Sequence, residues 1–141
     1  MSIRVTSWVF DHAPVKGTDL VLLLVIGDRA NEDGTDAWPA ISTIAKRSRV
    51  PRRTAQRRLR RLEEVGELVT LVGIGPRGQN IYIVRMGRTN DELSPIVARI
   101  VKRWGTPKLL PPLPVRSNGG GGDILTRGGG TSDARYILNV H

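Results

Sequence analysis

The stretch VPRRTAQRRLRRLEE, which runs from Val50 to Glu64, contains six arginines and no acidic residue before its last two positions. Its apolar residues Ala55, Leu59 and Leu62 recur at spacings of four and three, which places them on one side of a helix. Proline is favoured in the first turn of a helix and glycine just after the last. The pattern therefore predicts a helix from about residue 51 to residue 65, closed by Gly66.

The arginines of this helix are arranged unfavourably for an isolated helix. Like charges four residues apart, as in Arg53–Arg57 and Arg57–Arg61, each destabilise a helix by about 0.2–0.5 kcal/mol. The helix dipole also disfavours cations in the first turn. A phosphate backbone would supply the missing negative charge, and the planar guanidinium suits both phosphate and guanine. The residues that point away from the apolar side are Arg53, Gln56, Arg57 and Arg60, flanked by Arg52, Thr54, Arg58 and Arg61.

The excess positive charge of the chain is concentrated around this helix. The 141 residues carry 22 Lys and Arg against 13 Asp and Glu, a net charge of +9. Nine of these cations and no acid lie between Lys46 and Leu62, which leaves 22 − 9 = 13 cations against 13 acids elsewhere. Such a concentration indicates a polyanionic partner. The alternative is a basic face that serves solubility alone.

The flanking segments predict the remaining elements of a winged helix-turn-helix. Leu20 to Ala30 is predicted to be a mostly apolar helix, with Thr18 as its N-cap and Asp19 in the first turn. A short second helix is predicted to start at Pro39 and to run to about Arg47. The tight connection SRVP leads into the basic helix. Two β-rich runs, 68–72 and 81–84, flank a Gly/Pro/Asn loop and predict a hairpin. The predicted fold class is therefore mainly α with a small β-hairpin, and residues 1–87 are expected to form a DNA-binding domain.

The two ends of the chain are less regular. Residues 2–17 show a short alternation and are interpreted as a strand or an extended arm. Residues 94–104 predict an amphipathic helix capped by Ser94 with Pro95 at its first position, within a segment 88–105 that packs on the domain or mediates a homodimer. Residues 106–141 are rich in proline and glycine and are expected to be a mostly disordered tail with a possible protein partner.

Winged helix-turn-helix geometry assigns roles to the basic residues, because the start of the third helix meets base edges in the major groove. We therefore predict base contacts from Arg52, Arg53, Gln56 and Arg57. Arg77, at the hairpin tip, is the predicted wing contact to the minor groove or a phosphate. The residues expected on the DNA backbone surround the turn or lie along the basic helix: Ser42, Thr43, Lys46, Arg47, Arg49, Thr54, Arg58, Arg60 and Arg61.

Several other classes of function lack support in the sequence. The chain has no cysteine and two histidines far apart, so neither a disulfide nor a zinc site is expected, and a cytoplasmic location is favoured. The longest apolar run, Leu20 to Ile26, is too short to cross a membrane. No Ser/His/Asp set, carboxylate pair or phosphate-binding loop is visible. We therefore expect a protein without enzymatic activity, metal or cofactor.

Residues 18–85 resemble the helix-turn-helix module of small winged-helix proteins from actinobacterial phages, plasmids and integrative elements. Three positions depart from that pattern: Ala40 and Pro51 replace serines, and Arg58 replaces a small residue. Loss of a serine cap costs about 1 kcal/mol. The matching residues are Asp28, Ala30, Asn31, Asp33, Gly34, Trp38, Pro39, Thr43, Ala45, Arg53, Thr54, Gln56, Leu59, Leu62 and Gly66.

The resemblance implies sequence-specific binding of double-stranded DNA, with transcriptional control in a phage or mobile element as the leading role. Replication initiation at an origin is an alternative, because the same module occurs in initiators. Two further alternatives are RNA binding by the arginine-rich helix and an adaptor that acts through its tail. The predicted hairpin favours duplex DNA over RNA.

Overall fold

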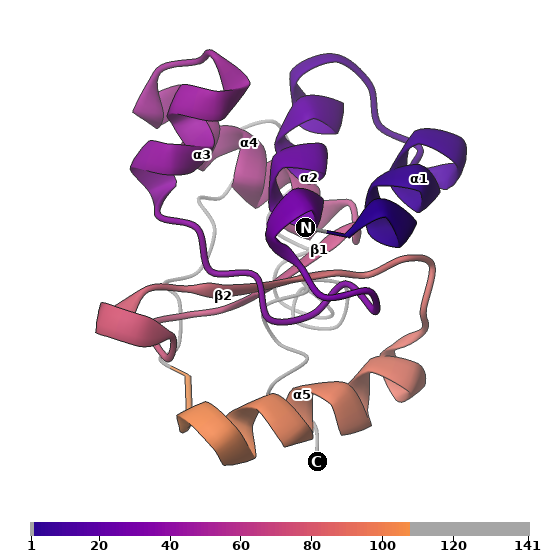
Figure 1. Cartoon of the computed structure of the whole chain (residues 1–141), viewed down its shortest axis with the longest axis vertical. Coiled ribbons are helices and arrows are strands. Elements are labelled where there is room, and N and C mark those ends of the chain that lie inside the picture. Colours follow the sequence, from indigo (N-terminus) through magenta and orange to yellow (C-terminus); the bar gives the residue numbers. More distant parts are fainter. Residues whose placement is uncertain (1, 108–141) are drawn as a thin grey trace, which may run out of the picture.

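The computed structural model describes residues 2–107 and shows helices packed on both faces of a small hairpin (Figure 1). Four helices lie on one face and the last helix lies on the other. This arrangement confirms the predicted fold class, a mainly helical chain with a two-stranded hairpin after the helix-turn-helix. The elements are α1 (Ile3–His12), α2 (Gly17–Arg29), α3 (Ile41–Ser48), α4 (Arg52–Glu64), β1 (Leu68–Leu71), the 3₁₀ turn η1 (Pro76–Gly78), β2 (Ile81–Val84) and α5 (Asn90–Trp104).

The N-terminal segment is a helix, so the predicted strand or extended arm is wrong. Ser2 caps α1 by accepting a hydrogen bond from the Val5 amide. Val5 and Val9, four residues apart, are fully buried against α2. Gly27 of α2 lets the two helices approach closely, because a Cβ atom there would lie 3.0 Å from Val5 Cγ1. Tertiary packing therefore decides the conformation of a helix too short to be stable alone.

The central helix α2 is apolar on most sides and forms the middle of the core. Leu22, Leu23 and Ile26 are fully buried. The helix begins at Gly17 after the N-cap Lys16, which lies two residues before the predicted cap at Thr18. α3 likewise begins at Ile41, after Ala40, so Pro39 lies just outside the helix that it was expected to start.

The turn between α3 and α4 is tight and carries a strained residue. Arg49 has φ 62° and ψ 38°, the left-handed conformation that glycine usually adopts at this position. The amide of Arg49 donates to Lys46 and that of Val50 donates to Ala45, which closes the end of α3. Pro51 then precedes the first residue of α4 as its N-cap, so the predicted helix start is shifted by one residue.

Both faces of the hairpin are buried, which explains its continuous apolar runs. Strand residues Leu68 and Val84 are paired and belong to the core formed with α1–α4. The next pair, Val69 and Ile83, points to the opposite face and packs with α5. The core of the protein therefore consists of two apolar clusters separated by one sheet.

The last helix, α5, starts earlier than predicted. Thr89 and Glu92 form a capping box, in which the Thr89 side chain accepts from the Glu92 amide and the Glu92 carboxylate accepts from the Thr89 amide. Ser94 and Pro95 therefore lie inside the helix, and the predicted cap at Ser94 is wrong. The earlier start brings Leu93, which is fully buried, onto the apolar stripe with Val97 and Ile100. α5 packs on the hairpin.

The loop between α2 and α3 is tied to the hairpin. Ala37 forms an isolated bridge with Tyr82, and the Val84 amide donates to the Gly34 carbonyl. Arg88 donates to the carbonyls of Asp33 and Val84 at 2.6 and 2.9 Å. A Cβ at Gly34 would lie 2.6 Å from the Val84 oxygen, so only glycine permits this close approach. These bonds hold the loop, the hairpin and the start of α5 together.

Within residues 2–107, no helix is long and apolar enough to span a membrane. The predictions of a mostly disordered tail and of a protein partner for it concern residues 106–141. All but the first two of these residues lie outside the described part of the chain.

Candidate nucleic-acid interface

The helix α4 buries one side and exposes the other, as its sequence pattern predicts. Ala55 and Leu62 are fully buried and Leu59 is 5% exposed, which places the apolar seam against the core. The opposite side is accessible to solvent. The four predicted base-reading residues are all exposed: Arg52, Arg53, Gln56 and Arg57.

The exposed arginines at the start of α4 have no internal counter-ion. Within residues 2–107, no ion pair includes Arg52, Arg53 or Arg57. Pro51 supplies no side-chain cap, and the first turn contains no acid. Free amide groups, a positive helix end and three guanidiniums thus coincide, an arrangement that suits an anion. Whether each residue contacts a base stays a prediction.

The middle of α4 is anchored by ion pairs that the sequence pattern did not reveal. Asp19, in the first turn of α2, lies 3.6 Å from Arg58 through Oδ1 and Nη1, and 3.3 Å from Arg61 through Oδ2 and Nε. The Asp19 side chain is 11% exposed, whereas that of Arg61 is 59% exposed. Asp19 therefore partly neutralises two of the residues predicted to contact the DNA backbone.

A second pair acts at the other end of α2. The Asp28 carboxylate accepts a hydrogen bond of 3.0 Å from Arg47 in α3. The sequence carried a signal for both acids, because Asp19 and Asp28 bracket the apolar run of α2. Their ion-pairing role could not be predicted, because it depends on the packing of α3 and α4 on α2.

The remaining backbone candidates lie around the helix-turn-helix. α3 begins at Ile41 without a side-chain cap, and Ser42 and Thr43 occupy its first turn. Ser42, Lys46 and Arg49 are exposed. Thr54 is partly buried, and so is Arg60, although the helical repeat placed Arg60 on the outward side. The structure thus places these residues on consecutive elements, and their contacts with DNA remain predictions.

The hairpin tip is an ordered loop. Gly73 donates to the Asn80 side chain at 3.0 Å, and Ile74 is buried against the α5 cluster. Arg77 is exposed at the tip, in the 3₁₀ turn, with φ 58°. Its predicted role as a wing contact is untested, but its side chain is accessible.

The acid Glu63 has a structural role. Its side chain is buried and accepts a hydrogen bond of 2.6 Å from the Thr70 hydroxyl in β1. Glu64, the next residue, is exposed. Of the two acids at the end of α4, one therefore joins the helix to the hairpin and the other faces solvent.

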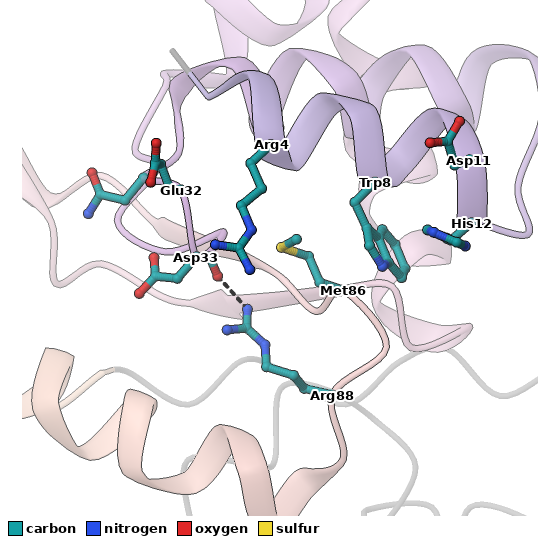
Figure 2. A pocket seen from close by; sticks show the side chains of 9 residues that line it. Arg4, Trp8, Asp11, His12, Glu32, Asp33, Met86 and Arg88 are labelled. Carbon is teal, nitrogen blue, oxygen red and sulfur yellow. Dashed lines mark hydrogen bonds between the residues drawn. The ribbon is translucent and has the colours of Figure 1, made fainter.

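An open pocket of about 840 Å³ lies away from α4, beside α1 (Figure 2). Its wall combines Trp8 and Met86 with the charged side chains Arg4, Asp33 and Arg88. Burial lowers the pKa of the Arg88 guanidinium, and the nearby Asp33 opposes that change. Charges of both signs line this pocket, so it lacks the single-sign character of α4.

Within the described residues, no group of three or more His, Cys, Asp or Glu could hold a metal ion.

A family model described as a helix-turn-helix domain matches residues 16–66, which span α2, α3 and α4. The chain therefore contains a helix-turn-helix domain, the class of module that the sequence predicted. No curated protein and no solved structure matches the chain.

Proposed function

We propose, from the premise that residues 16–66 form a helix-turn-helix domain, that this protein binds double-stranded DNA sequence-specifically with α4 in the major groove. The observation that carries the proposal is the exposed, unpaired arginine face at the start of α4. A solubility face would not require arginines at the positive end of a helix that has no side-chain cap.

The mechanism divides the basic residues into two groups. Arg52, Arg53, Gln56 and Arg57 contact base edges, because guanidinium and amide groups form paired hydrogen bonds with guanine and adenine. The backbone group supplies affinity through release of counterions from phosphates. Ion pairing to Asp19 and Asp28 supports this division, because paired arginines lie beside the predicted reading face and not at its centre.

The hairpin supports duplex DNA as the partner. Arg77, exposed at its tip, is proposed to contact the minor groove or a phosphate beside the major groove that α4 occupies. The tip is held by the Gly73–Asn80 bond, so Arg77 would be presented without a large loss of loop entropy. An arginine-rich helix alone would suit RNA as well as DNA.

We further propose that the protein regulates transcription in the cytoplasm of a host that carries a phage or mobile element. This role rests on the resemblance described for residues 18–85. Replication initiation uses the same contacts, so DNA binding is common to both roles. If the preferred sequence lies beside a gene start and the protein changes transcription from that site, the regulatory role is supported.

The decisive experiment is selection of bound sequences from random duplex DNA, followed by titration of the enriched site at several salt concentrations. We expect an enriched motif and an affinity that falls steeply with salt, because several arginines displace counterions. Structured RNA of equal length serves as the competitor. The absence of a motif together with tighter RNA binding would contradict the proposal.

A further inference from the structure

The helix α1 presents an exposed apolar pair that the DNA-binding surface does not include. Ile3 is 75% exposed and Phe10 is 67% exposed, the two highest values among the large hydrophobic residues of the described chain. They are seven residues apart and therefore lie on one side of the helix, away from the buried Val5 and Val9. Burial of this pair against a partner would remove its apolar surface from water.

Charged residues accompany the apolar pair along the same exposed face. Arg4 and Asp11 are also seven residues apart and exposed, and both line the rim of the pocket beside α1, into which the Arg4 side chain extends in Figure 2. With Ser7 set at zero and 100° per residue, Ile3 and Phe10 lie at about −40° and −60°. Arg4 and Asp11 lie at about +60° and +40°. Ser7, small and exposed, marks the centre between the two pairs.

This pattern is self-complementary. A two-fold axis perpendicular to two antiparallel helices keeps each flank on its own side and reverses the chain direction. Crossing at Ser7 would therefore bring Ile3 against Phe10 of the second copy. The other flank would bring Arg4 against Asp11 of that copy. At a rise of 1.5 Å per residue, each facing pair is offset by only about 1.5 Å along the axis.

We propose that two copies of this chain associate through α1, antiparallel and centred on Ser7, with two apolar contacts and two ion pairs per dimer. Charge complementarity selects a second copy as the occupant, since a purely apolar partner would leave Arg4 and Asp11 without counter-charges. Within the described residues, neither Arg4 nor Asp11 forms an ion pair.

The surface is compatible with the rest of the fold. α1 lies on the side of α2 opposite α3 (Figure 1), so association leaves α4 accessible. The apolar stripe of α5 is already covered, because it packs on the hairpin. A single ten-residue helix forms a small interface, so we expect a weak dimer whose population rises with concentration. The inference does not depend on DNA binding.

Sedimentation equilibrium of the full chain without DNA tests the association. We expect the average mass to rise toward twice that of the monomer across the micromolar to millimolar range. Phe10→Ser and Arg4→Asp should each leave a monomer at the same concentrations, with unchanged helical circular dichroism because both sites are exposed. The double variant Arg4→Asp/Asp11→Arg should restore the dimer. Val65→Ser, at an exposed apolar residue outside α1, is the matched control and should dimerise normally.

Cross-linking provides an independent test of the geometry. The chain has no cysteine, so Ser7→Cys introduces a single thiol at the proposed axis. Under mild oxidation it should form a covalent dimer much faster than Ala98→Cys, an exposed position on α5. A wild-type chain that stays monomeric overturns the proposal. The same conclusion holds if the reason is that residues 108–141 cover Phe10 in the same chain. Equal cross-linking rates, or no rescue by the charge exchange, would also overturn it.

Discussion

Asp19 of α2 lies 3.3 Å from Nε of Arg61 in α4, so an acid of the supporting helix reaches an arginine of the predicted DNA-binding helix. The same carboxylate lies 3.6 Å from Arg58. Asp19 is buried at the helix boundary while both arginines keep substantial exposure. Phosphates and Asp19 would therefore compete for the same guanidiniums.

Asp19→Asn should separate stability from DNA affinity. Removal of the charge abolishes two ion pairs and a favourable acid in the first turn of α2, which together contribute about 1 kcal/mol. The same change frees Arg58 and Arg61, so affinity for duplex DNA should rise several-fold and the salt slope should steepen by about 1–2. Thermal unfolding and fluorescence titration at several salt concentrations measure the two effects.

The control for Asp19→Asn is Asp91→Asn, which removes one exposed acid from the first turn of α5 and should alter DNA affinity much less. A fall in the affinity of the Asp19 variant would show instead that Asp19 orients the arginines for binding. The hypothesis of competition would then be wrong.

Arg57→Ala should weaken binding to the preferred sequence by roughly 1–3 kcal/mol. Arg57 is exposed and forms no ion pair within residues 2–107, so its loss should leave the melting temperature nearly unchanged. Lys102→Ala removes an exposed cation from α5 and serves as the charge-matched control. A large drop in melting temperature, or an equal loss of affinity in both variants, would argue against a specific role for Arg57.

The helices whose apolar residues recur at the helical repeat were the elements that the sequence predicted. Ala55, Leu59 and Leu62 define the buried side of α4 because the helical repeat alone relates them. The ion pairs of Asp19 were not predictable, since they join residues from different helices. The burial of Glu63 was likewise not predictable, because its partner Thr70 lies in β1.

The ends of the helices show why local signals can mislead. Ser94 and Pro95 together resemble a helix start, yet the capping box at Thr89 satisfies two amides and allows Leu93 to be buried. Ile3 and Val5 alternate as in a strand, but burial of Val5 and Val9 against α2 favours a helix. In both cases tertiary packing outweighs the local pattern.

The capping box predicts a pH-dependent contribution of Glu92. A hydrogen bond from the Thr89 backbone, and then one with its side chain, lowers the pKa of the Glu92 carboxyl below its ordinary 4.5. A lowered pKa in the folded state stabilises the protein above the unfolded pKa, and this contribution is lost as pH falls through the folded value. Glu92→Gln should therefore reduce the urea midpoint at pH 7, and its difference from the wild type should shrink as pH falls through the folded pKa of Glu92.

Thr89→Ala is the companion variant for the capping box. It removes the hydroxyl that accepts from the Glu92 amide, so it should destabilise the protein by about 1 kcal/mol. Because the hydroxyl is uncharged, much of this loss should persist at pH 3. A Glu92→Gln difference that is the same at pH 3 and pH 7 would show that the carboxylate is not the stabilising species.

Arg49→Gly should stabilise the protein while it weakens DNA binding. Arg49 holds a left-handed conformation that costs an L-residue roughly 1–2 kcal/mol, and glycine removes that strain at an unfolded-state entropy cost of about 0.4–1 kcal/mol. The net gain should lie between about 0 and 1.6 kcal/mol, visible as a higher melting temperature. Loss of a phosphate contact should reduce the salt slope by about 1.

Arg49→Lys keeps the charge and the strain, so it should retain both the wild-type salt slope and the wild-type stability. An unchanged salt slope in Arg49→Gly would show that Arg49 does not contact a phosphate, because this variant lacks the Arg49 charge.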